Sequence, residues 1–60
     1  MTRPATAYLA AYATPQRLGN GDPFLALLAG AERRGWVLLT HDSGGVTVAL
    51  TEAGRREAGL

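Results

Sequence analysis

The amino-acid sequence predicts a compact α+β domain with two to three helices, a two-stranded β-hairpin and a short C-terminal helix. An apolar run with helical spacing follows Asp22-Pro23, and two alternating apolar runs flank a glycine-containing turn at residues 42–45. Thr51 then precedes a last short segment that suits a helix. Because 60 residues have room for only one small hydrophobic core, we expect a single domain over residues 1–60.

The N-terminal segment predicts a first short helix. Pro4 suits a first helical turn, and apolar residues then recur at helical spacing: Ala5, Tyr8, Leu9 and Tyr12. The helix should end near Thr14, because the residue before Pro15 is pushed away from helical angles. We expect a short turn over residues 15–18, followed by a flexible hinge at residues 19–21.

The clearest predicted helix follows Asp22. Asp22 is a favourable N-cap, Pro23 fits the first helical position, and Gly35 supplies a left-handed stop. Trp36 comes directly after the stop and can fold back onto the helix. One apolar stripe is expected to face the core, formed by Phe24, Leu27, Leu28 and Ala31 and widened by Leu25.

A β-hairpin and a last helix complete the predicted domain. Residues 36–41 and 46–51 form the two strands, and residues 42–45 form the turn. An even-length loop brings the apolar residues of the core face together: Val37, Leu39, Val46, Val48 and Leu50. The opposite face then carries Trp36, Leu38 and Ala49. Thr51 can cap a short helix over residues 52–58.

The order of these elements resembles the back half of a winged-helix domain. The resemblance is carried by Ala31-Glu32-Arg33-Arg34-Gly35-Trp36-Val37, then a glycine-turn hairpin, then Leu50-Thr51-Glu52-Ala53-Gly54-Arg55. It covers residues 22–60 and implies three helices followed by a two-stranded wing. The predicted first helix and the turn after Thr14 would stand for the first two helices. The resemblance also implies that residues 23–34 enter the DNA major groove and that the tip at 42–45 touches the DNA backbone.

DNA binding is therefore one candidate function, and its candidate residues are Arg17, Arg33, Arg34, Arg55 and Arg56. The exposed face of the helix at 23–34, however, offers mostly small residues, and only Arg33 suits base recognition. At the hairpin tip, Asp42 would repel phosphate. We therefore treat a DNA-binding transcriptional regulator as the alternative function, with DNA as the alternative partner.

Binding of a protein partner fits the same positions better. The candidate partner-binding residues are Ala26, Ala29, Gly30, Arg33, Trp36 and Leu38. The small residues would leave a shallow groove, and tryptophan is enriched at interface hot spots. Two plainer interpretations stay open: Trp36 caps its own helix, or Ala26 and Ala29 are helix formers on a solvated face. Gly30 fits the second one less well, since a mid-helix glycine costs about 1 kcal/mol.

The leading hypothesis is thus a small non-enzymatic protein-binding module. Its size is similar to that of small phage and mobile-element proteins, including anti-CRISPR and polymerase inhibitors. By this analogy, the domain would sterically block a host protein that handles nucleic acid.

Composition argues against several kinds of site. The chain has no cysteine and one histidine, so neither a disulfide nor a zinc site is favoured, and we expect no metal and no cofactor. His41-Asp42-Ser43 contains the residue types of a hydrolase triad. Adjacent strand residues point to opposite faces, however, so these side chains should not converge. We expect no enzymatic activity.

Charge and hydropathy bear on partners and location. A net charge of +1 does not by itself imply a polyanionic partner. The sequence shows no signal-peptide pattern, and its longest apolar run, residues 24–31, is far shorter than the ~20 residues of a membrane span. We therefore expect a cytoplasmic protein with no membrane partner. Small domains without disulfides often gain stability by self-association, which makes a homodimer a further expectation.

Overall fold

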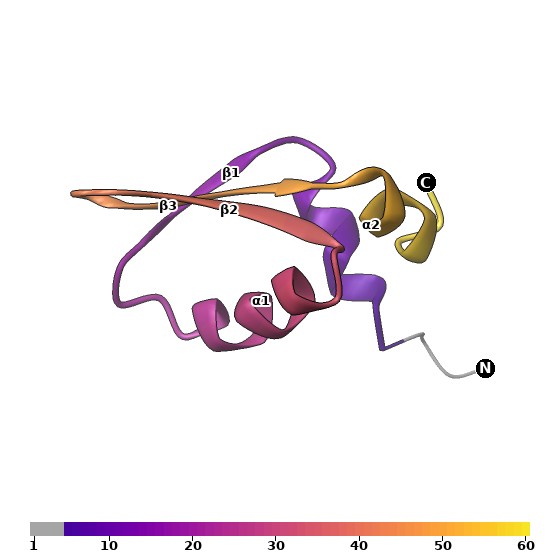
Figure 1. Ribbon diagram of the computed structural model, residues 1–60, viewed down its shortest axis with the longest axis horizontal. Coiled ribbons are helices and arrows are strands. Elements are labelled where there is room, and N and C mark those ends of the chain that lie inside the picture. Colours follow the sequence, from indigo (N-terminus) through magenta and orange to yellow (C-terminus); the bar gives the residue numbers. More distant parts are fainter. Residues whose placement is uncertain (1–4) are drawn as a thin grey trace.

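The computed structural model describes residues 5–60 and confirms the α+β class. Pro4, the expected first residue of the first helix, lies outside the described residues. A 3₁₀-helix, three strands and two α-helices follow one another along the chain (Figure 1): η1 Ala7–Tyr12, β1 Gln16–Gly19, α1 Phe24–Arg33, β2 Val37–Asp42, β3 Gly45–Leu50 and α2 Glu52–Glu57.

The hairpin of β2 and β3 has the predicted register. Asp42 pairs with Gly45 across a two-residue loop, and Leu39 pairs with Val48. Because side chains alternate between faces, the expected apolar set shares one face of the sheet: Val37, Leu39, Val46, Val48 and Leu50. Leu38, on the opposite face, is 59% exposed.

The prediction of a turn over residues 15–18 was wrong, since Gln16–Gly19 form strand β1, which also includes the first residue of the expected hinge at 19–21. β1 pairs antiparallel with β3, so the sheet has three strands in the order β1-β3-β2. A strand fits here because Leu18 pairs with Val46 and packs against the core. The close approach needs glycine at position 45, where a Cβ would lie 2.2 Å from the carbonyl oxygen of Leu18. Within residues 5–60, only two helices therefore precede the hairpin, whereas the resemblance implies three.

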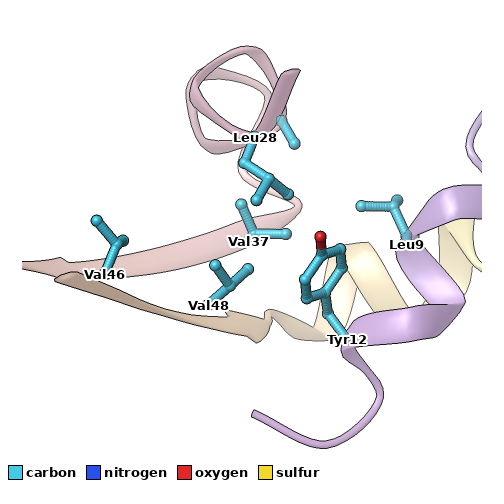
Figure 2. Close-up of a cluster of buried hydrophobic side chains, with 7 residues drawn as sticks. Leu9, Tyr12, Leu28, Val37, Val46 and Val48 are labelled. Atoms are coloured by element: carbon cyan, nitrogen blue, oxygen red, sulfur yellow. The ribbon is translucent and has the colours of Figure 1, made fainter. Parts of the chain in front are cut away.

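The hydrophobic core lies between the sheet and the first two helices (Figure 2). Its buried members are Leu9 and Tyr12 from η1, Leu28 and Ala31 from α1, and Val37, Val46 and Val48 from the sheet. In Figure 2, Leu28 points from α1 toward Val37, and Leu9 and Tyr12 close one side of the cluster. α2 packs against η1 and the end of β3 at the same end of the sheet.

The predicted core stripe of α1 is only partly correct. Leu28 and Ala31 are buried, but Phe24 is 51% exposed and Leu27 is 44% exposed. At 3.6 residues per turn, these two side chains lie on one flank of the Leu28 direction. The buried Ala31 lies on the same flank but nearer the C-terminal end of α1. The structure therefore covers that end of the apolar stripe and leaves the first turn of the helix exposed.

Both ends of α1 have the expected caps. The carboxylate of Asp22 accepts a hydrogen bond from the Phe24 N–H at 2.8 Å, and Pro23 has helical angles. At the other end, Gly35 adopts a φ of 79°, and the Trp36 N–H donates to the carbonyl of Ala31 at 3.0 Å. This is the glycine-based stop that the sequence predicts.

The C-terminal helix is also capped as predicted. The Thr51 hydroxyl accepts from the Gly54 N–H at 3.0 Å and donates to the carbonyl of Gly35. α2 lies so close to the start of β2 that a Cβ on Gly54 would be 1.8 Å from the Trp36 carbonyl oxygen. Gly54 thus permits close packing, although it weakens the isolated helix. None of the helices within residues 5–60 has the length and hydropathy needed to cross a bilayer.

Candidate functional site

The N-terminal turn of α1 carries an exposed apolar surface. Pro23, Phe24 and Leu27 line an open hollow of about 290 Å³, and we call these three residues the apolar patch. The patch lies in a regular, capped part of the helix, since Asp22 holds the first turn through the Phe24 N–H. Its exposure therefore belongs to the folded structure and is not a consequence of a frayed helix end.

The three small residues of α1 that the sequence offers to a partner differ in exposure. Ala26 is exposed and Ala29 is half-buried, but Gly30 is buried. The Arg34 guanidinium covers Gly30, with its Nη1 atom 3.4 Å from the Gly30 carbonyl oxygen. A Cβ at position 30 would lie 3.3 Å from the same nitrogen. Gly30 thus makes room for an arginine of its own chain, which gives a physical reason for a mid-helix glycine.

Trp36 and Leu38, the two expected anchors, differ in exposure. Trp36 is half-buried and packs against the core, and the Arg34 guanidinium lies 5.4 Å from its ring centroid. This geometry favours the plainer interpretation, in which Trp36 completes its own helix cap. Leu38 is well exposed on the uncovered face of the sheet, as predicted. Arg33 is exposed at the end of α1.

Arg17, a candidate phosphate ligand, is already paired within the chain. Its guanidinium binds both carboxylate oxygens of Asp42, and the Nη2–Oδ1 distance is 2.8 Å. Asp42 also accepts the N–H groups of Gly44 at 2.8 Å and Gly45 at 3.0 Å. The Arg17 hydrogen bonds, followed by that from Gly44, hold the pKa of Asp42 well below its usual range. The charge of Asp42 is thus largely compensated, which corrects the expectation of a repulsive hairpin tip.

The five candidate arginines do not form one cluster. Arg17 belongs to the hairpin-tip end, whereas Arg33 and Arg34 end α1 and Arg55 and Arg56 lie on α2, at the other end of the sheet (Figure 1). A strand of six residues, such as β2, spans about 20 Å. The four arginines away from the tip are exposed, and Arg56 lies 3.9 Å from the Glu52 carboxylate.

The residues of the candidate triad, His41, Asp42 and Ser43, share no side-chain hydrogen bond within residues 5–60. Asp42 is held by Arg17 and two turn amides, so it does not orient His41. The cross-strand partner of His41 is the apolar Val46. Between residues 5 and 60, no three potential metal ligands come together.

Sequence reasoning missed the apolar patch as a surface, although a signal for it was present. Apolar side chains on α1 extend from Leu25 on one flank to Leu27 on the other, with Leu28 between them. One side of a helix against a small sheet buries a narrower stripe than this. The width of the stripe is a signal for Leu27 at its edge, but not for Phe24, which points close to the direction of the buried Ala31 and is exposed at the start of the helix.

Comparisons of the chain with protein-family models, with curated proteins and with solved structures find no match.

Proposed function

We propose that this chain is a non-enzymatic protein-binding module that holds its partner through the apolar patch of Pro23, Phe24 and Leu27. The observation that carries the proposal is the exposure of two large apolar side chains, 51% for Phe24 and 44% for Leu27, on a well-capped helix. Scattered apolar residues are common on protein surfaces, but these two lie together in one hollow.

The energetics favour a partner with its own apolar side chain or helix. Complete burial of a leucine or phenylalanine side chain is worth about 1.5–3 kcal/mol, and roughly half of that remains available at each of these positions. Two half-exposed side chains alone give weak binding, so the partner must also contact the polar surroundings. The patch would then be the centre of the interface, with polar residues at its rim.

The structure departs from the winged-helix resemblance in the stretch before α1. The resemblance implies a further helix before α1, and the chain has β1 in that stretch instead. A helix of the partner would supply the missing cover for Phe24 and Leu27. The narrower form of the proposal, steric inhibition of a host protein that handles nucleic acid, rests on analogy in size with phage and mobile-element inhibitors.

A comparison of two variants tests the proposal. The double variant Phe24→Ala, Leu27→Ala removes most of the patch, whereas Ala26→Ser changes an exposed residue of the same helix outside it. Partners captured from host extract by the wild type should be retained by Ala26→Ser and lost by the double variant. Equal capture by all three folded proteins would show that the patch is not the binding site.

DNA binding is the second candidate, and one observation favours it. Because Arg17 compensates Asp42, the hairpin tip no longer opposes a phosphate backbone, while four arginines stay exposed at the other end. Such binding would depend mainly on phosphate contacts, since α1 presents few groups that read bases. Affinity measured by gel shift should then fall steeply with salt, and Arg33→Gln with Arg34→Gln should reduce it. Absence of any shift at low salt excludes this function.

A further inference from the structure

β2 is an edge strand with an open hydrogen-bonding side. In the order β1-β3-β2, one side of β2 pairs with β3 and the other side faces away from the sheet. The Thr51 N–H donates to the Trp36 carbonyl at 3.0 Å, which makes Trp36 and Thr51 a hydrogen-bonded pair of the antiparallel ladder. Such pairs alternate with non-bonded ones, so the backbone groups of Val37, Leu39 and His41 point to the open side.

These outward groups have no partner within residues 5–60, since no hydrogen bond outside the ladder reaches them. Edge strands of stable monomers are usually protected by a lysine, a proline, a bulge or a covering segment. β2 contains neither lysine nor proline, and its pairing with β3 is continuous from Val37 to Asp42. The edge is therefore available for pairing with another strand.

We propose that the open edge of β2 pairs with β2 of a second copy of this chain. The pairing is antiparallel, with a two-fold axis at Leu39, and joins two sheets into one of six strands. This inference goes beyond the proposed function, because the β2 edge and the apolar patch on α1 are different surfaces.

The sequence of β2 is complementary to itself in this register. Leu39 pairs with Leu39 of the second copy, and Val37 pairs with His41, so that outward-facing backbone groups meet each other. On the uncovered face, Leu38, which is 59% exposed, lies opposite Thr40 of the second copy and diagonally across from its Leu38. The half-buried Leu39 gains its own counterpart as a neighbour on the core face.

The charged residues at β2 are also compatible with pairing to a second copy of the chain. Asp42 is the acidic residue of β2, and in this register it lies opposite Trp36 of the second copy. The Arg34 guanidinium lies 5.4 Å from the centroid of the Trp36 ring, and Asp42 is already bound by Arg17, so this end of the paired strands brings no negative charges together. No like charges face each other along the six residues of β2.

The contact area sets the expected affinity. One pair of short strands buries less than the ~800 Å² per partner of a standard interface. We therefore expect a concentration-dependent dimer with a Kd on the order of 10–100 µM. Sedimentation of the purified chain from low-micromolar to near-millimolar concentration should show the conversion of monomer to dimer. A monomer throughout this range would overturn the proposal.

Two matched double variants test the register. In Leu38→Lys, Thr40→Lys, like charges face each other at both 38–40 pairs, and we expect at least a tenfold weaker dimer. In Leu38→Glu, Thr40→Lys, the same residues are replaced but opposite charges meet, and dimerisation should return close to that of the wild type. Equal dimerisation of the two variants contradicts this register. The Phe24→Ala, Leu27→Ala variant should dimerise normally, which separates this surface from the proposed partner-binding patch.

Amide hydrogen exchange provides a test that needs no variant. The Leu39 N–H faces the open edge, whereas the Leu38 N–H belongs to the ladder with β3. The exchange rate of the Leu39 amide should therefore fall as the protein concentration rises, in proportion to the fraction of chains in the dimer. The Leu38 amide should stay protected at all concentrations. Exchange at Leu39 that is independent of concentration overturns the proposal even where a variant fails to fold.

Discussion

The hairpin tip and the first turn of α1 differ in whether their exposed groups have partners within the chain. At the tip, Asp42 satisfies two turn amides and binds Arg17, so the polar groups there have partners within the chain. At the first turn of α1, Asp22 caps the backbone, but Phe24 and Leu27 remain half-exposed. The backbone is regular both at the hairpin tip and in the first turn of α1. The difference shows that the open apolar surface arises from a lack of covering structure and not from a poorly formed helix.

Leu27 and Leu28 provide the sharpest form of this comparison, because they are neighbours on one helix with opposite burial. Leu28 is 0% exposed and Leu27 is 44% exposed. Leu28→Ala should destabilise the domain by about 3 kcal/mol, since it loses buried apolar area and leaves a cavity. Leu27→Ala should cost about 1 kcal/mol. Urea unfolding followed by circular dichroism measures both, and similar losses for the two variants would contradict the exposed position of Leu27.

The next largest effect concerns the close contact of β1 with β3. Gly45→Ala would place a Cβ 2.2 Å from the Leu18 carbonyl oxygen, so one of the strands must move. We expect a loss of about 2 kcal/mol, as for an overpacked core. Gly19→Ala is the matched control in β1, because a Cβ there has no neighbour within 4 Å. Equal melting temperatures for these two variants would indicate that β1 does not pair as described.

The difference between local and long-range interactions explains which parts of the structure the sequence predicts. The caps at Asp22, Gly35 and Thr51 act within a few residues, and the α1, β2–β3 and α2 elements that they frame were all expected. Likewise, the alternation of apolar residues sets the facing of β2 and β3 without knowledge of any distant segment. Local signals were therefore sufficient for these elements.

Non-local contacts were not predictable in this way. β1 has one apolar residue, Leu18, and it pairs with a strand about thirty residues away in the sequence. No periodic pattern of apolar residues therefore predicts this strand. The Arg17–Asp42 pair spans 25 residues. Phe24 and Leu27 were assigned to the core because helical spacing shows which side chains share a flank but not how much surface is present to cover them.

The contribution of the Arg17–Asp42 pair can be measured through the pH dependence of the folding stability. Loss of this pair should cost less stability than the packing variants, because both side chains are about half exposed. The pKa of Asp42 is lowered in the folded state, chiefly by Arg17. Its contribution to stability is therefore present above the unfolded value of about 4 and is lost as the pH falls through the folded value. Asp42→Asn removes this contribution.

Thermal unfolding of the wild type and of Asp42→Asn between pH 7 and pH 2 provides the measurement. The wild type should be the more stable protein at neutral pH, and the difference should shrink as the pH falls below about 4. Other carboxylates titrate in the same range in both proteins, so only the difference between the two curves reports on Asp42. Added salt should narrow the gap at pH 7 modestly, since the pair is exposed to solvent. A constant difference at every pH would mean that Asp42 acts through its turn hydrogen bonds, which asparagine can partly keep, and that its charge pair with Arg17 contributes nothing to the hairpin tip.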